Sequence, residues 1–171
     1  MITIRPEQPD DITAVHLINE KAFGQPAEAN LVDRLRAACP NVLSLVALSG
    51  DHVVGHILFT PVTIQSARGE LQGMGLAPMA VVSERQRQGI GSQLVEAGLK
   101  VLRQRVCPFV IVLGHPEYYP RFGFVPVSQR GLACQWEGVP DDAFMVLILD
   151  EASMVGVSGV ARYRDEFDEA M

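Results

Sequence analysis

A turn that carries two glycines, between a predicted strand and a predicted helix, is the part of the sequence best suited to bind a ligand. Residues 76–82 form an apolar run typical of a buried strand, and a helical pattern starts near Gly89. The apolar residues of this helix recur on one face: Ile90, Leu94, Ala97, Val101 and Leu102. A helix N-terminus presents backbone N–H groups and partial positive charge, and glycine lets an anion come close to the backbone. Gly89 and Gly91 therefore predict a phosphate site, where Arg85 and Arg87 could add charge-assisted bonds.

The spacing around these glycines excludes two common phosphate-binding motifs. No Gly-Lys-Ser/Thr ending follows Gly89, as a P-loop requires, and Leu94 stands where the dinucleotide fingerprint needs its third glycine. What matches is Gln86-Arg87-Gln88-Gly89-Ile90-Gly91, which resembles the Q/R-x-x-G-x-G/A signature of the GNAT (Gcn5-related) N-acetyltransferases. Proteins of that family bind the pyrophosphate of acetyl-CoA at this signature. The alternative is a tight strand-to-helix turn without a ligand.

A second segment resembles the same family. Residues 109–113 predict a short strand, and Tyr119-Pro120-Arg121-Phe122-Gly123-Phe124 after it is similar to the later Y-x-x-x-G-F motif. The run LGHPEYYPRFGF resembles in particular the YhbS-like branch of the superfamily. The resemblance extends from about residue 2 to residue 149. It implies an acetyl-CoA-dependent N-acetyltransferase in which a primary amine attacks the thioester directly in a ternary complex.

The pattern along the chain predicts an α/β protein. Strands are expected at 2–5, 42–48, 52–63, 71–82, 109–113, 124–127 and 144–149, with a polar loop at 128–142. Helices are expected from about residue 12 to Gly24, at 27–38 and at 89–105, with a short one at Tyr119, and Asp10 or Asp11 as the cap of the first. The resemblance implies a central twisted mixed sheet flanked by helices on both faces, whose fourth and fifth strands splay apart to admit the cofactor. We expect a single domain at 1–150, and a tail at 151–171 that Tyr163 and Phe167 anchor to it.

Composition narrows the class of partner. The net charge of −6 argues against a nucleic-acid surface, which needs a basic stripe. It is mildly consistent with a cationic amine acceptor, although solubility alone explains it. No apolar run reaches the length of a membrane span, and the first residues lack the pattern of a signal peptide. The three cysteines do not have the spacing of a metal site, and reduced thiols fit a cytoplasmic protein. His52 and His56 share a strand face but lack a third ligand, so we expect no metal site.

The resemblance also implies which residues hold acetyl-CoA. Backbone groups of Met79, Ala80 and Val81 would pair with the pantetheine arm, and an N–H near Ala80 or Val81 would face the thioester oxygen. The pyrophosphate would bind the backbone amides of Arg87, Gln88, Gly89, Ile90, Gly91 and Ser92. Tyr119 occupies the position of the family's general acid, and a phenol keeps its proton at neutral pH. Alternatively, the Tyr119 ring has only a packing role, and the adjacent Tyr118 is a second candidate for the general acid.

The general base is left open by the sequence. His115 follows the strand at 109–113 and is a residue type suited to proton transfer near neutral pH, although a structural hydrogen bond would explain it equally well. Glu28, Glu84 and a water chain are the other candidates.

Two other functions stay open beside N-acetyl transfer. One is a non-catalytic acyl-CoA-binding or regulatory module, and the other is an acyltransferase that uses a different acyl chain or an O-acceptor. The acceptor itself is expected to be a small-molecule or peptide amine. The family resemblance also allows a homodimer.

Overall fold

In a computed structural model of the chain, residues 1–169 are described, and they divide into two units. The first unit contains residues 1–60, 77–101 and 165–169, and the second contains residues 61–76 and 102–164. Two long strands, β3 (His52–Ser66) and β4 (Gly69–Val81), contribute residues to both. No helix within the described residues is both long and apolar enough to cross a lipid bilayer.

The sheet of the first unit joins the N-terminal strand to a hairpin that follows the two helices. β1 (Ile2–Pro6) pairs antiparallel with β2 (Leu43–Ser49), from Ile2 opposite Ser49 to Pro6 opposite Leu45. β2 in turn pairs antiparallel with β3, with one register shift between Ala47 and Leu48. The strand at 2–5 and the hairpin that follows the two helices were predicted, and both are confirmed.

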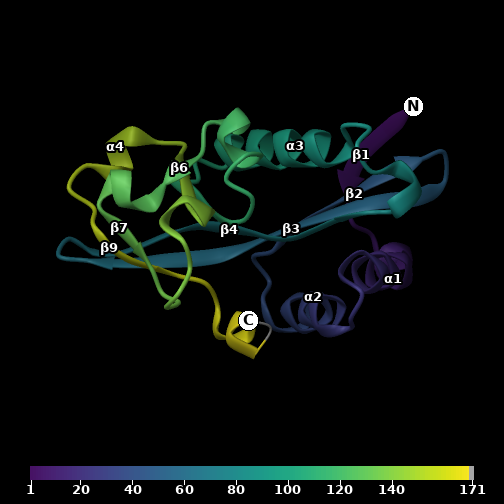
Figure 1. Cartoon of the computed structure of the whole chain (residues 1–171), viewed down its shortest axis with the longest axis horizontal. Helices are drawn as coiled ribbons and strands as arrows, with labels where there is room; N and C mark the ends of the chain where they lie inside the picture. The colour runs from purple at the N-terminus through teal and green to yellow at the C-terminus, as the bar shows by residue number, and fades with distance from the viewer. Residues whose placement is uncertain (170–171) are drawn as a thin grey trace. The chain divides into compact units, whose positions relative to one another are not determined.

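Helices cover both faces of this sheet (Figure 1). α1 (Ile12–Phe23) and α2 (Ala27–Ala38) lie on one face, and α3 (Ile90–Gln104) lies on the other. Successive side chains of a strand point to opposite faces of the sheet, so one strand can contact helices on both faces. His56 contacts α1, whereas a Cβ on Gly55 would lie 3.1 Å from Leu94 of α3. The predicted layout of a mixed sheet with helices on both of its faces is confirmed.

The start of α1 differs from the prediction that Asp10 or Asp11 caps it. The Asp11 carboxylate makes no cap bond to α1 and instead accepts the Gln8 N–H at 2.7 Å and pairs with Arg5 at 2.6 Å. These bonds close a short 3-10 turn at Pro9–Asp11 and hold the pKa of Asp11 below its usual value, chiefly through Arg5. The predicted cap is therefore wrong, because a nearer donor and an arginine claim the carboxylate.

The second unit is organised around β5 (Phe109–Leu113). This strand pairs parallel with β4 at Met74, Gly75 and Leu76, as the intervening helix predicts. On its other side it pairs antiparallel with β8 (Phe144–Ile148), which also pairs with β6 (Val125–Pro126). The strand expected at 124–127 is thus reduced to two residues.

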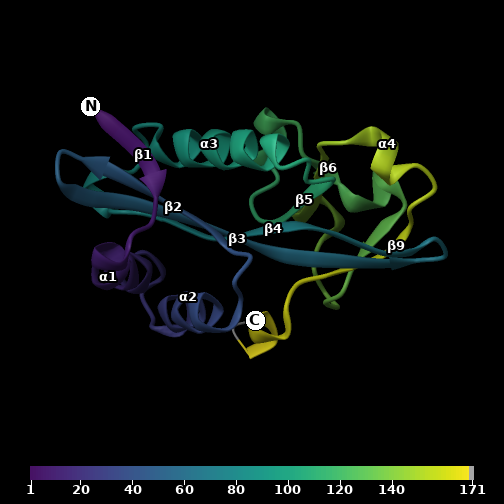
Figure 2. The ribbon, with the colours of Figure 1, turned by 180° about the vertical axis from the view of Figure 1, so that it is seen from behind.

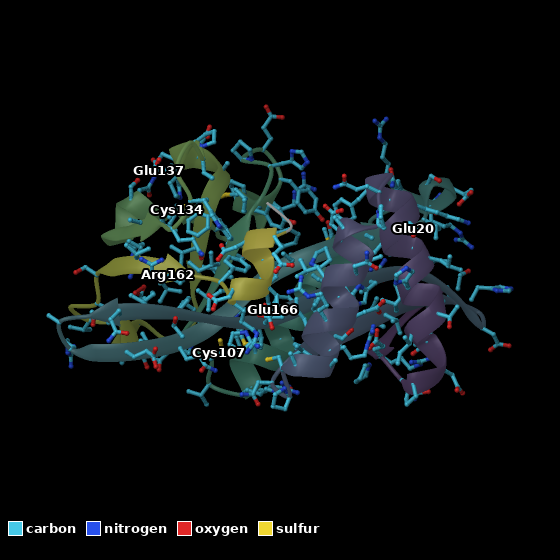
Figure 3. All side chains as sticks on the ribbon, turned by 90° about the horizontal axis from the view of Figure 1, so that it is seen from below. Glu20, Cys107, Cys134, Glu137, Arg162 and Glu166 are labelled. Atoms are coloured by element: carbon cyan, nitrogen blue, oxygen red, sulfur yellow. The ribbon has the colours of Figure 1, made fainter. Side chains whose placement is uncertain are left out.

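The polar loop expected at 128–142 contains a strand that the sequence prediction missed. β7 (Leu132–Cys134) pairs parallel with β9 (Gly159–Arg162). β9 in turn pairs antiparallel with β3 at Thr63 and Ile64 (Figure 2). Figure 3 labels Cys134 and Arg162 on these two strands. A strand of three residues has too few positions to show a period, so its sequence reads as loop.

The tail is structured in both units. Besides β9, it forms a short helix, α4 (Glu151–Met154), and a 3-10 helix at Asp165–Glu169. In the first unit, the side chain of Phe167 is buried and Glu169 pairs with Arg34 of α2 at 2.8 Å. In the second unit, the side chain of Tyr163 is buried.

Candidate functional site

The turn that precedes α3 contains two residues in the left-handed conformation, which also occurs in anion-binding concavities. Arg87 and Gly89 both adopt left-handed conformations, with φ of +64° and +84°. Left-handed residues in a tight turn direct successive N–H groups to one side, and for a non-glycine residue this conformation costs roughly 1–2 kcal/mol. The first bond of the helix runs from the Gln93 N–H to the Gly89 carbonyl at 3.0 Å. The amides ahead of Gln93 therefore precede the helical ladder, as the phosphate-site prediction requires.

Two glutamine side chains hold this turn in place. Gln86 Nε2 donates to the Val81 carbonyl at 3.1 Å, and Gln88 Nε2 donates to the Glu84 carbonyl at 3.2 Å. The sequence prediction gave these side chains no role, although glutamines spaced by two in a turn are a usable signal. The Gln86 bond ties the turn to the end of β4, so the two stretches predicted to bind acetyl-CoA are brought together in the first unit.

The two arginines of the turn differ. Arg85 donates to Ser49 Oγ of β2 at 2.7 Å, so its guanidinium is directed to the sheet and not toward the predicted phosphate site. Arg87 is exposed on the turn itself. The expectation that both arginines assist the phosphate therefore fits Arg87 alone.

The end of β4 carries Met79, Ala80 and Val81. In the described part of the chain, the ladder with β5 ends where Leu76 faces Val112, three residues before Met79. The Val82 N–H donates to the Val54 carbonyl of β3 at 2.9 Å. Because the peptide is planar and trans, the Val81 carbonyl points away from β3, where the Gln86 side chain reaches it. On this edge the Val81 carbonyl therefore accepts a side chain, and the ladder with β5 does not extend to it.

Tyr119, in the second unit, is a buried phenol. It begins a 3-10 turn (Tyr119–Phe122), and its ring packs edge-on against Tyr118 and Phe124, with centroids 5.0 and 5.8 Å away. A Cβ on Gly114 would lie 2.4 Å from this ring, so the glycine makes room for it. Burial, and secondarily Tyr118, raises the pKa of Tyr119 well above its ordinary value, so the phenol stays protonated at neutral pH.

His115 lies at the surface beside this turn. Its carbonyl accepts the N–H groups of Tyr118 and Tyr119 at 3.1 and 3.4 Å, which fixes the start of the turn. Its side chain borders a shallow polar depression of about 540 Å³, lined by His115, Pro116, Glu117, Tyr118 and Arg121. The structure thus brings His115, Tyr118 and Tyr119 together in the second unit.

The two glutamates proposed as bases belong to the first unit. The Glu28 carboxylate accepts both of its hydrogen bonds from Gln25 Nε2, at 3.0 and 3.2 Å, at the start of α2. Glu84 is exposed in the 3-10 turn Ser83–Arg85.

A buried polar cluster lies beneath α1. The fully buried His56 is 3.1 Å from Asn19 Nδ2 through Nδ1 and 2.9 Å from Ser44 Oγ through Nε2. Burial, and secondarily Arg36, lowers its pKa to about 3. The neutral ring therefore accepts the Asn19 amide at Nδ1 and donates from Nε2 to Ser44, an assignment that follows from the hydrogen-bond network. Across residues 1–169, no group of three or more His, Cys, Asp or Glu side chains could hold a metal ion.

Comparison with known proteins places these features in a family context. Residues 3–127 match the acetyltransferase (GNAT) domain family. The chain is 36% identical to the uncharacterized N-acetyltransferase YhbS of Escherichia coli K12, over 96% of this chain and 98% of YhbS. It is 41% identical to the uncharacterized N-acetyltransferase YjhQ of the same strain, over 69% of this chain and 66% of YjhQ.

Two solved structures are similar over almost the whole chain. YhbS from Escherichia coli in complex with CoA superimposes with a TM-score of 0.91 at 36% identity, over 98% of this chain and 92% of the other. A GNAT family acetyltransferase from Brucella melitensis in complex with acetyl-CoA superimposes with a TM-score of 0.80 at 33% identity, over 98% and 99%.

Proposed function

Because this chain belongs to the GNAT family of N-acetyltransferases, we propose that it transfers an acetyl group from acetyl-CoA to a primary amine by direct attack in a ternary complex. The observation that carries the proposal is the turn before α3, in which Arg87 and Gly89 are left-handed and the N–H groups precede the helical ladder. Two similar proteins hold CoA or acetyl-CoA in their structures, which supports the same co-substrate here.

The co-substrate would be held mainly by backbone groups. The pyrophosphate binds the amides of the turn and of the first turn of α3: Arg87, Gln88, Gly89, Ile90, Gly91 and Ser92. The pantetheine arm pairs with Met79, Ala80 and Val81 as an added strand. Val81 supports this role because its carbonyl points away from β3. The Val81 N–H shares that edge in an extended strand and is the donor we assign to the thioester oxygen.

Tyr119 is the general acid in this proposal. The neutral amine attacks the thioester carbon and forms a carbon–nitrogen bond, and the carbon–sulfur bond breaks. The CoA thiolate takes the phenol proton, and the proton lost by the new amide nitrogen passes to the base and from there restores the phenol. The raised pKa keeps the buried phenol protonated before the step, and it also makes the phenol a weaker acid toward the thiolate. The ring contacts with Tyr118 and Phe124 fix its direction.

His115 is the base candidate with the most support, because it is exposed and borders the same depression as Tyr118. Glu28 is a weaker candidate for the base, because its carboxylate already accepts two hydrogen bonds from Gln25. Glu84 and a water chain remain as alternatives.

The acceptor class is proposed as a small-molecule or peptide amine, and the acidic net charge of −6 is compatible with it. A cytoplasmic location, supported by three unpaired cysteines, and a homodimer stay predictions. The same holds for the single domain at 1–150.

The proposal is tested by release of CoA. The full chain is incubated with acetyl-CoA and a panel containing a polyamine, lysine, an aminoglycoside and a peptide with a free N-terminus, and the free thiol is titrated. Amine-dependent thiol release supports the proposal. Acetyl-CoA binding without release for any amine favours the non-catalytic module, and faster release from a longer acyl-CoA favours the acyltransferase with a different acyl chain.

A further inference from the structure

Tyr163, just after β9, reaches the end of the ladder between β4 and β5. Its side chain is buried, and its hydroxyl is 3.1 Å from the Ile111 carbonyl and 3.3 Å from the Leu76 carbonyl. In the β4–β5 ladder Gly75 faces Ile111 and Leu76 faces Val112, the last pair of that ladder in the described residues. One phenol therefore contacts a carbonyl on each strand where their pairing stops.

The surroundings leave the phenol a single position. A Cβ on Gly75 would lie 2.5 Å from the Tyr163 ring, so the ring rests directly on the glycine backbone. Trp136 covers the ring with its centroid 5.5 Å away, and the Tyr163 N–H donates to Gln135 Oε1. Burial raises the pKa of Tyr163 far above its ordinary value, so the hydroxyl remains a donor at any physiological pH.

We infer that Tyr163 is a positioning residue that holds Leu76 and, through the continuous backbone of β4, orders the residues that follow it, 77–81. Residues 77–81 include Met79–Val81, which we propose to bind acetyl-CoA. The expected effect of Tyr163 on acetyl-CoA binding therefore rests on the proposed function. The one hydroxyl proton is within reach of a carbonyl on each strand, and it holds the end of the β4–β5 ladder in one conformation. Tyr163 lies outside residues 3–127, the part of the chain that matches the family.

Tyr163→Phe is the direct test, because the phenyl ring still fills the space over Gly75 while the hydroxyl is lost. Val160→Ala is the matched control: it removes packing from the same strand, β9, at a half-buried residue, and leaves the hydroxyl in place. Acetyl-CoA affinity is measured by calorimetry, well below the melting temperature of each variant. We expect Tyr163→Phe to raise the Kd about tenfold, equivalent to about 1.4 kcal/mol, and Val160→Ala to stay within twofold of wild type.

Hydrogen exchange on the ligand-free protein separates this inference from the proposed function. Amides of residues 77–81 should exchange faster in Tyr163→Phe than in wild type or Val160→Ala. Unchanged exchange there, unchanged Kd in Tyr163→Phe, or an equal loss of affinity in Val160→Ala would overturn the inference. Failure of the wild-type protein to bind acetyl-CoA would overturn the proposed function, while the exchange experiment would still decide whether Tyr163 orders β4.

Discussion

Two substitutions of Gly89 test separately whether the turn needs a glycine and whether it binds an anion. With φ of +84°, any other residue there is strained by roughly 1–2 kcal/mol. No atom lies within 4 Å of a Cβ at this position, so neither alanine nor the first carbon of glutamate meets a neighbour. Both variants should fold, and a glutamate beside the N-terminus of α3 recovers about 0.3–1 kcal/mol from the helix dipole.

Gly89→Glu nevertheless should bind acetyl-CoA more weakly than Gly89→Ala. A carboxylate about 5 Å from a phosphate is repelled by about 0.8 kcal/mol at the dielectric constant of water and by about 3 kcal/mol at an effective value of 20. The Kd ratio of the two variants should thus lie between about 4 and about 160, and it should fall with added salt. Calorimetry at two salt concentrations measures it. A ratio below two, in two folded proteins, would refute the placement of the pyrophosphate at this turn.

Three further outcomes follow from the site and the core. Tyr119→Phe keeps the ring on Gly114 and Phe124, so we expect kcat to fall by about 100-fold or more while the acetyl-CoA Kd stays within twofold; an unchanged kcat would move the acid role to Tyr118 or water. His115→Ala should flatten the pH dependence of kcat/KM near neutral pH, and an unshifted profile would exclude His115 as the base. His56 has a folded-state pKa of about 3 against 6.5 for its ordinary value, so its contribution to stability is complete above pH 6.5 and is lost as pH falls toward 3. The free energy of unfolding should drop by up to about 1.4 kcal/mol per pH unit in that window, and His56→Gln should remove this slope. Urea denaturation at pH 7 and pH 5 measures the free energy of unfolding of wild type and His56→Gln. An equal change in this free energy between the two pH values in both proteins would contradict the prediction.

The sequence predicted the fold well where long periodic segments or a motif gave a signal. α3, α1 and α2 follow from apolar spacing, and β5 is parallel to β4 because a helix joins them. The resemblance to the YhbS-like branch is confirmed by 36% identity over 96% of the chain.

What the sequence missed depends on contacts between distant segments. β7 and β9 are too short to show a period, and they exist because they pair with each other and with β3. Asp10 or Asp11 was predicted to cap α1, but the Asp11 carboxylate binds Arg5 and the Gln8 amide instead. The bond from Tyr163 to Leu76 joins residues 87 positions apart, which no local pattern can report.

Thermal unfolding with and without acetyl-CoA tests the central claim most directly, with NADH and ATP as controls. A ligand that binds only the native state adds about 2.7 kcal/mol at a hundredfold excess over its Kd, which for a chain of this size raises Tm by about 5–10 °C. We predict that rise for acetyl-CoA and not for NADH or ATP. A Tm unchanged by acetyl-CoA, in folded protein free of bound CoA, would contradict the assignment of the turn before α3 as an acetyl-CoA site.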